Sequence, residues 1–534
     1  MLDNDQILRI EDLSVDFDTK HGLVHAVRGV SFEIGAGETL AVLGESGSGK
    51  SVSASTILDL IDMPPGRIAS GRIHYRGRDI LAMSADERRY LAGRKIAMVF
   101  QDPLAALNPV YTVGWQIEEV FRLHPSLGVA DPRQEAIRLL SRVGIPEPET
   151  RIDYYPHQFS GGQRQRVVIA MAIAGRPDLL IADEPTTALD VTIQAEILKL
   201  LRSLQKEQGM ALLMITHDLG VVADVADRVV VMQNGVIVEK GERDQILHDP
   251  KHPYTRHLLD SVPGRHGFVP ESVPDSAPAL LSVVHASKRY GGFKALDDVS
   301  ITLKQGETLG IVGESGSGKS TLMRLILELE KPTEGVIEFE GKAIAGMDRR
   351  ERARLNREIQ VVFQDPSASL NPYMTIEEII SEPWAIHRDA LPKSQWKETV
   401  AKLLVQVGLS PQHARRYPHQ FSGGQRQRIA IARAIALKPK LLVCDEALSA
   451  LDVSIQAQVL RLLKTLRSEL GLSFVFVAHD LLIVRDFCHR VAVMKSGSII
   501  EQGDTHEVFT KPQHEYTKTL LEANSFARLL EPVA

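Results

Sequence analysis

Two copies of the sequence GESGSGKS combine the residue types that bind a phosphate chain. Their glycines let consecutive backbone N–H groups turn toward phosphate oxygens, and a helix that starts there directs its positive end at the same point. Lys50 and Lys319 add a positive charge, and the hydroxyls of Ser51 and Ser320 can ligate Mg²⁺. A chance glycine-rich turn is the alternative, and the second copy argues against it. The candidate phosphate-binding residues are Gly44, Glu45, Ser46, Gly47, Ser48, Gly49, Lys50 and Ser51 in the first copy and Gly313, Glu314, Ser315, Gly316, Ser317, Gly318, Lys319 and Ser320 in the second.

Two pairs of acidic residues supply the groups that hydrolysis of a phosphate bond needs. Asp183 is followed by Glu184, and Asp445 by Glu446. The first acid of each pair can hold Mg²⁺ through water, and the second can polarise an attacking water as a general base. Acid pairs after strands are also common helix caps. Because each pair follows a phosphate-binding sequence in its own half, catalysis is the favoured interpretation.

A histidine follows a later apolar run in each half, at His217 and at His479. A lone histidine after a strand is usually structural. Its repetition at the corresponding position of the second half favours a neutral imidazole that senses a γ-phosphate or orders the hydrolytic water.

The sequence SGGQ occurs in both halves just before a run of small and apolar residues that is typical of a packed helix. Serine and glycine at a helix N-terminus offer a second place for an anion, with a plain helix cap as the alternative. Each half therefore holds two helix starts suited to phosphate, and one triphosphate can be contacted from both sides. These residues are Ser160, Gly161, Gly162 and Gln163, and Ser422, Gly423, Gly424 and Gln425.

Short apolar runs typical of strands precede these chemical groups, which are therefore expected at the C-terminal ends of the strands. A helical stretch follows each glycine-rich sequence, as a phosphate-binding loop requires. The runs are 39–43 and 308–312 before the glycine-rich sequences, 179–182 and 441–444 before the acid pairs, and 212–215 and 474–477 before the histidines.

The whole set of motifs occurs twice in the same order, which indicates two similar domains. YPHQFSGGQRQR at 155–166 is identical to 417–428 at all twelve positions. A chain of 534 residues exceeds one hydrophobic core. Between the copies a Pro-rich stretch without apolar periodicity reads as a linker. We therefore expect domains at 1–260 and 280–534 and a linker at 261–279.

Composition limits the kind of protein and its partners. A net charge of −6 and a pI near 6.3 argue against a surface that coats a polyanion. Only two cysteines, Cys444 and Cys488, are present, so neither a disulfide framework nor a Cys-rich metal site is expected. The first residues lack the basic and apolar pattern of an export signal. The longest apolar run, 167–174, is too short to cross a membrane, so any membrane contact is expected to go through other subunits.

Together, these motifs resemble those of the ABC transporter ATPases, and the resemblance spans nearly the whole chain. It implies an α/β fold with two tandem P-loop NTPase nucleotide-binding domains, each with a RecA-like core, an antiparallel β subdomain and an α-helical subdomain. It implies ATP and Mg²⁺ as ligands, with Gln101 and Gln364 near the metal and in the segments that pass motion to membrane subunits. It also implies head-to-tail pairing, with Lys50 facing Ser422 and Lys319 facing Ser160. Phe17 and Tyr290 occupy the positions where family members stack adenine.

Sequences after each cassette, KHPYTRHLLDSVP and PQHEYTKTLL, are similar to those of the dipeptide, oligopeptide and nickel importer branch. Fused members of this branch serve importers of glutathione, microcin C and related peptides. The resemblance implies two integral membrane permease subunits as partners, an external solute-binding protein as an indirect one, and no nucleic acid. It places the chain at the cytoplasmic face of the inner membrane as a peripheral protein. Two scattered cysteines cannot build the iron–sulfur cluster of some branch members, so none is expected.

One motif departs from the family pattern, because the second acid pair continues as DEALSALD and lacks the proline of DEPTTALD. Asp445, Glu446 and Asp452 all remain, so we expect this site to be active. A soluble tandem ATPase acting on ribosomes or DNA is the main alternative, but such proteins typically have a long, charged helical linker. A fused sugar-importer ATPase is the other, and it usually shows a degenerate second site.

Overall fold

The computed structural model describes residues 6–20, 22–187, 189–263, 273–274, 276–449, 451–478 and 480–523. Its contacts divide the chain into two compact units, with the division between Asp260 and Ser261. His479 and most of the linker expected at 261–279 lie outside the described residues. Throughout the described ranges, no helix combines the length and the apolar character needed to cross a bilayer.

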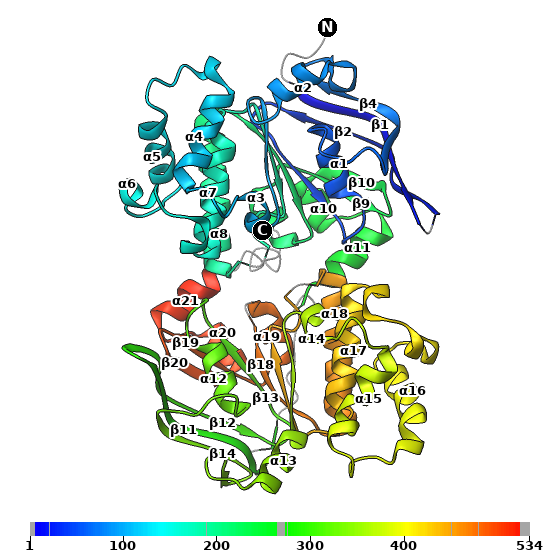
Figure 1. The fold of residues 1–534 in the computed structure, drawn as a ribbon, viewed down its shortest axis with the longest axis vertical. Helices are drawn as coiled ribbons and strands as arrows, with labels where there is room; N and C mark the ends of the chain where they lie inside the picture. Colours follow the sequence, from blue (N-terminus) through cyan, green and yellow to red (C-terminus); the bar gives the residue numbers. More distant parts are fainter. Residues whose placement is uncertain are drawn as a thin grey trace. The chain divides into compact units, whose positions relative to one another are not determined.

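A six-stranded sheet forms the centre of the first unit (Figure 1). Five neighbouring strands run parallel, and the edge strand β10 is antiparallel to β9. Every residue of β3, β7 and β8 is buried, which explains why these strands appear in the sequence as unbroken apolar runs. In sheet order, the strands are β10 (Val236–Glu242), β9 (Arg228–Gln233), β3 (Thr39–Leu43), β8 (Ala211–Thr216), β7 (Leu179–Asp183) and β6 (Ile96–Val99).

Helices that connect these strands return the chain from the carboxyl end of the sheet to its amino end, where the next parallel strand begins. The helix α1 follows β3 directly, α8 lies between β7 and β8, and α9 follows β8. Parallel strands joined in this way place their C-terminal ends at one edge, where ligands of open α/β sheets bind. The helices of the first unit outside the α3–α7 group are α1 (Lys50–Ile57), α2 (Ala85–Leu91), α8 (Val191–Gln208), α9 (Leu219–Val225), α10 (Arg243–His248) and α11 (Pro253–Asp260).

Two further parts complete the first unit. An antiparallel sheet in the order β2-β1-β4-β5 packs its apolar face with β3 and α1 in one core. A group of helices, α3 to α6, packs against α7 in a second core (Figure 1). The bounds are β1 (Gln6–Thr19), β2 (Gly22–Gly35), β4 (Gly66–Tyr75), β5 (Arg78–Asp79), α3 (Pro103–Ala106), α4 (Val113–Leu123), α5 (Pro132–Arg142), α6 (Pro148–Arg151) and α7 (Gly161–Ala174).

The second unit repeats this architecture strand for strand. Its central sheet has the order β16-β17-β18-β13-β19-β20 and its antiparallel sheet the order β12-β11-β14-β15. The central strands are β13 (Thr308–Val312), β16 (Ile359–Val362), β17 (Leu441–Asp445), β18 (Ser473–Val477), β19 (Arg490–Lys495) and β20 (Ser498–Asp504), and the antiparallel ones are β11 (Ala279–Tyr290), β12 (Phe293–Lys304), β14 (Glu334–Phe339) and β15 (Lys342–Ala343). The predicted α/β fold, with three parts in each half, is confirmed.

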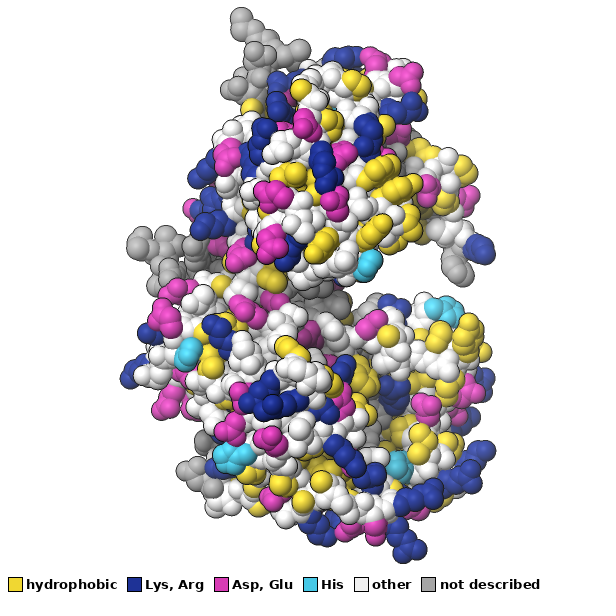
Figure 2. Space-filling model, turned by 60° about the vertical axis from the view of Figure 1, so that its left-hand side comes forward, with side chains coloured by type: hydrophobic (Ala, Val, Ile, Leu, Met, Phe, Trp, Pro, Cys, Tyr) yellow, Lys and Arg dark blue, Asp and Glu magenta, His cyan; other side chains and the backbone are white. Residues whose placement is uncertain are grey.

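The helices of the second unit follow the same plan. The helix α12 follows β13, and α14 to α16 pack with α17 as their counterparts do in the first unit. The bounds are α12 (Lys319–Ile326), α13 (Arg349–Glu358), α14 (Pro366–Ser369), α15 (Ile376–Ile386), α16 (Trp396–Gln406), α17 (Gly423–Ile435), α18 (Val453–Leu470), α19 (Leu481–Phe487), α20 (Thr505–Thr510) and α21 (Glu515–Glu522). On the face drawn in Figure 2, acidic and basic side chains are interspersed over the surface.

Candidate nucleotide sites

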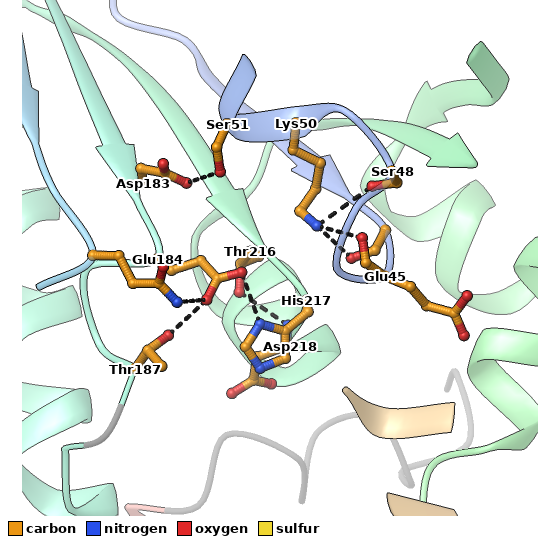
Figure 3. A network of polar contacts seen from close by, with 12 residues as sticks. Glu45, Ser48, Lys50, Ser51, Asp183, Glu184, Thr187, Thr216, His217 and Asp218 are labelled. Carbon is orange, nitrogen blue, oxygen red and sulfur yellow. Dashed lines mark hydrogen bonds and ion pairs between the residues drawn. The ribbon is translucent and has the colours of Figure 1, made fainter. Parts of the chain in front are cut away.

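The glycine-rich sequence of the first unit forms the loop between β3 and α1. Gly49 has a φ of 99°, and a Cβ there would lie 2.5 Å from the carbonyl oxygen of Ala26, so only glycine fits. Lys50 is the first residue of α1, and its Nζ donates to the carbonyl oxygens of Gly44 and Glu45 at 2.8 Å each (Figure 3). The ammonium group is therefore held above a loop whose backbone conformation glycine sets.

The second unit has the same loop between β13 and α12. Gly318 has a φ of 107°, and its Cβ would lie 2.8 Å from the carbonyl oxygen of Ala295. Lys319 Nζ donates to the carbonyl oxygens of Gly313 at 2.7 Å and Glu314 at 2.9 Å. Both lysines are about nineteen-twentieths buried, so each charge is held inside its loop. The two loops are equivalent in geometry as well as in sequence.

Asp183, the first member of the acid pair in the first unit, lies beside this loop at the end of β7. Ser51 Oγ donates to Asp183 Oδ1 at 3.0 Å (Figure 3). Burial raises the pKa of Asp183, although the bond from Ser51 opposes the shift. A carboxylate oxygen and a hydroxyl oxygen thus meet where the sequence predicted a metal site. In the second unit, Asp445 ends β17 and Ser320 follows Lys319 at the start of α12.

Three side chains contact the carboxylate of Glu184, the next residue. Gln101 Nε2 donates to its Oε2 at 2.7 Å, and Thr187 Oγ1 donates to the same oxygen at 3.0 Å. His217 Nδ1 lies 3.0 Å from Oε1 (Figure 3). Burial would raise the pKa of Glu184, but the hydrogen bond and charge of His217 and the bond from Thr187 outweigh it and lower that pKa. The carboxylate is thereby kept ionised and oriented.

Glu184 and Glu446 both have a strained backbone. Each has a φ of 47°, in the left-handed region that costs a non-glycine residue on the order of 1 kcal/mol or more. The Glu184 N–H donates to the carbonyl oxygen of Ile215 at 2.9 Å, and the Glu446 N–H to that of Val477 at 3.0 Å. These bonds to the neighbouring strand maintain the conformation.

The carboxylate of Glu446 has a related but not identical set of contacts. Gln364 Nε2 donates to Glu446 Oε2 at 2.8 Å, as Gln101 does in the first unit. Ser449 stands where the first unit has Thr187, and its Oγ donates at 2.9 Å to the backbone carbonyl of Glu446 instead of the carboxylate. Thr187 and Ser449 were not among the residues singled out from the sequence. Their only signal there is the small hydroxyl residue three places after each glutamate.

Both SGGQ sequences cap a helix. The N–H groups of Gln163 and Gln425 donate to the hydroxyls of Ser160 and Ser422 at 3.3 and 3.4 Å, and the glutamine side chains accept in return. These are capping boxes at the starts of α7 and α17. A Cβ on Gly162 would lie 2.6 Å from Ile193, and one on Gly424 2.3 Å from Ile455. The second glycine therefore allows the helix to approach α8 or α18.

The aromatic residues near the loops differ in their surroundings. Phe17 packs onto the core of the antiparallel sheet beside Gly66. The Tyr290 hydroxyl bonds to Glu330, and Lys288 Nζ lies 5.2 Å from the centre of its ring. A cavity of about 190 Å³ beside the second loop is lined by Phe293, Lys319 and Glu446 among others. Phe293, which pairs with Tyr290 across the hairpin, is an additional aromatic candidate that the sequence did not reveal.

Comparison with known protein families shows to which family the chain belongs. The sequence model of the family described as ABC transporter matches residues 27–187 and again 296–449, which together span more than half of the chain. The chain belongs to the ABC transporter family. It is an ABC-type ATPase with two cassettes.

Other comparisons place this ABC ATPase more closely. A second family model, described as the C-terminal region of oligopeptide/dipeptide transporters, matches residues 238–278 and 500–528. The chain is 46% identical to a glutathione import ATP-binding protein of Escherichia coli O157:H7, over 98% of this chain and 90% of that one. A protein of the same name from Pectobacterium atrosepticum is 45% identical over the same shares. A solved cassette of Clostridium perfringens, cbiO1, is 32% identical, with a TM-score of 0.41 over 44% of this chain and 92% of its own.

Proposed function

We propose that this chain is the ATP-hydrolysing subunit of an importer for peptides or peptide-like solutes. The observation that carries the proposal is the match of both halves to the C-terminal region of oligopeptide/dipeptide transporters. The names of the relatives support it, because glutathione is itself a small peptide. The subunit works at the cytoplasmic face of the inner membrane, bound to two membrane-spanning permease subunits, while a separate protein outside delivers the solute.

Glu184 and Glu446 act as general bases toward the attacking water, and His217 and His479 orient that step. Four observations on Glu184 support its role: a strained backbone, a lowered pKa, contacts from three side chains, and a position directly after the strand that carries Asp183. Strain of this kind is concentrated at functional sites. Glu446 shares the backbone conformation and the contact from glutamine.

The residues around Asp183 fit a magnesium ion. Mg²⁺ prefers oxygen ligands such as carboxylates, hydroxyls and amide carbonyls. Asp183 and Ser51 supply a carboxylate and a hydroxyl that are hydrogen-bonded to each other, and Gln101 supplies an amide that contacts the adjacent Glu184. When bound, the ion neutralises charge that develops on the phosphate oxygens. Asp445, Ser320 and Gln364 play the same part in the second unit.

Each ATP is bound by residues of both halves. The two loops supply Lys50 and Lys319, and the capped helix starts supply Ser160 and Ser422, which gives each half one phosphate loop and one second helix start. In this proposal Lys50 shares its nucleotide with Ser422, and Lys319 shares its nucleotide with Ser160. The domains are residues 1–260 and 280–534, joined by the linker at 261–279. Adenine stacks on the aromatic side chains near the loops, with Phe293 added to Phe17 and Tyr290.

The pH dependence of hydrolysis should reveal the contact between His217 and Glu184. A general base works only when ionised, and the bond from His217 lowers the pKa of Glu184. In a Glu446→Gln background, we expect His217→Ala to raise the pKa of Glu184. The loss of ATPase activity on acidification will then begin at a higher pH.

The matched control for this experiment is His248→Ala. His248 is exposed and bonds only locally, to the backbone of Asp244. Its pH profile should coincide with that of the Glu446→Gln parent. An unshifted acid limb in the His217→Ala variant would exclude His217 as the group that keeps Glu184 ionised.

Uptake by cells that make this chain tests the transport proposal. Deleting the gene should remove ATP-dependent uptake of labelled glutathione or short peptides, and the wild-type gene should restore it. The gene with Glu184→Gln and Glu446→Gln should not. Unchanged peptide uptake with a loss of sugar uptake would instead support a sugar importer, and cosedimentation with ribosomes would support a soluble tandem ATPase.

A further inference from the structure

The last helix described in each unit contacts the phosphate loop through a tyrosine hydroxyl. In the first unit the backbone N–H of Glu45 donates to Tyr254 Oη at 3.2 Å. In the second the N–H of Glu314 donates to Tyr516 Oη at 3.1 Å. Tyr254 lies in α11 and Tyr516 in α21, and their exposed fractions are 8% and 7%. In both halves, the hydroxyl of a buried tyrosine therefore contacts the phosphate loop.

The loop residue that meets the tyrosine is also the one that holds the lysine. The carbonyl oxygen of Glu45 accepts from Lys50 Nζ at 2.8 Å, and that of Glu314 accepts from Lys319 Nζ at 2.9 Å. Each glutamate is therefore bonded on both of its backbone polar groups, to the tyrosine on one side and to the lysine on the other. The tyrosine hydroxyl fixes the point at which the chain leaves β3 or β13 and begins the loop.

A carboxylate on the edge strand anchors the segment that carries the tyrosine. Glu239 of β10 accepts from the N–H groups of Lys251 at 2.7 Å and His252 at 3.0 Å. Although burial opposes ionisation, the hydrogen bonds that Glu239 accepts lower its pKa, so it remains a carboxylate. His252 Nδ1 in turn accepts from the N–H of Tyr254 at 3.2 Å, at the start of α11.

The second unit repeats every contact of this anchor. Glu501 of β20 accepts from the N–H groups of Gln513 at 2.8 Å and His514 at 3.0 Å. His514 Nδ1 accepts from the N–H of Tyr516 at 3.0 Å. In both units, the same series of bonds therefore runs from the edge strand to the phosphate loop. It passes through the segment between the edge strand and the end of α11 or α21, which we call the tail.

Simple packing does not account for the hydroxyl. The two helices, PYTRHLLD and EYTKTLLE, agree at only four of eight positions, yet both keep the tyrosine. A phenylalanine ring would fill the same space, and what tyrosine adds is the hydrogen bond to the loop. The tails also lie within the ranges matched by the oligopeptide/dipeptide transporter C-terminal region, 238–278 and 500–528.

We propose that Tyr254 and Tyr516 are positioning residues, and that the tail of each half sets the ATP affinity of that half's loop through them. The inference rests on the proposed function in one respect, because it takes these loops to be where ATP binds. The tyrosines act through Glu45 and Glu314 and do not themselves touch the nucleotide. The tail is thus a structural part of each nucleotide site.

The test is the full-length variant Tyr254→Phe with Tyr516→Phe, which removes two hydroxyls and keeps both rings. We expect the Kd and the KM for ATP to rise about five- to tenfold, the effect of losing one hydrogen bond at each site. We expect kcat to change by less than about twofold and Tm by less than about 2 °C. A purely structural role would lower Tm and would not separate KM from kcat.

Tyr90→Phe is the control, because Tyr90 lies in α2 with its side chain about half exposed and should leave all four quantities unchanged. A second variant, Glu239→Gln with Glu501→Gln, should raise the Kd in the same direction by weakening the anchors. An ATP affinity in the Tyr→Phe variant equal to or tighter than that of the wild type would overturn the inference. A wild-type chain that binds no ATP would instead contradict the proposed function.

Discussion

ATP hydrolysis falls at least about 100-fold when Glu184 and Glu446 are both replaced by glutamine, while ATP binding is retained. Glutamine keeps the size of the side chain and can still bond to its neighbours, but an amide cannot take a proton from water. Loss of a general base costs about 100-fold or more. Each single substitution should leave hydrolysis at the other site. Steady-state phosphate release and equilibrium binding of labelled ATP measure the two properties separately.

A matched pair of substitutions controls for the loss of two negative charges. Glu149 and Glu398 are exposed glutamates at the surface of helices in the first and second unit, and Glu149→Gln with Glu398→Gln should hydrolyse ATP at the wild-type rate. Turnover above about a tenth of the wild-type rate in the Glu184→Gln, Glu446→Gln protein would remove these residues as the bases.

The number of ATP molecules bound by two double variants should differ by one. If Lys50 and Ser422 serve one nucleotide, Lys50→Ala with Ser422→Glu damages a single site and leaves one ATP per chain. Lys50→Ala with Ser160→Glu damages both sites and leaves none. The glutamate repels a triphosphate, but an anion is favourable at a helix N-terminus, so α7 and α17 should remain folded.

Each double variant serves as the control for the other, because both carry one lysine and one serine substitution. Lys319→Ala provides the mirror-image test, with Ser160→Glu as its same-site partner and Ser422→Glu as its opposite-site partner. If each pocket were instead built within one half, the two outcomes would be exchanged. Counting bound nucleotide at an ATP concentration that saturates the wild type distinguishes these results.

The central strands could be predicted from sequence because burial on both faces leaves a plain signal. The runs 39–43 and 308–312 coincide with β3 and β13, and the run before Asp183 is one residue shorter than β7. The glycine-rich loops can also be predicted from sequence, because only glycine fits at Gly49 and Gly318. Both residues have positive φ values, and a Cβ at either would clash with a carbonyl oxygen. In both cases, the local sequence carries the constraint.

Contacts between distant residues could not be predicted in the same way. Tyr254 meets a loop residue 209 positions earlier, and Tyr516 one that is 202 positions earlier. No local pattern marks either pair. Phe293 borders the cavity beside the second loop only because the β11–β12 hairpin brings it there. The strained φ of Glu184 arises from its bond to Ile215 on the next strand, which the sequence around Glu184 does not reveal.

The roles of the aromatic residues illustrate the same limit. Phe17 and Tyr290 occupy equivalent positions, because each pairs with the residue two places before Ala26 or Ala295, the alanines that lie against the two glycine-rich loops. Their neighbours differ: Phe17 packs on the core, whereas the Tyr290 hydroxyl bonds to Glu330. Equivalence in sequence therefore fixed the position of each residue but not its contacts.

The most direct test of the central claim is a structure of the Glu184→Gln, Glu446→Gln protein with ATP and Mg²⁺ bound. The account predicts two ATP molecules per chain, one between Lys50 and Ser422 and the other between Lys319 and Ser160. An ATP molecule enclosed entirely by residues of one half, or fewer than two ATP molecules per chain at saturation, would contradict it.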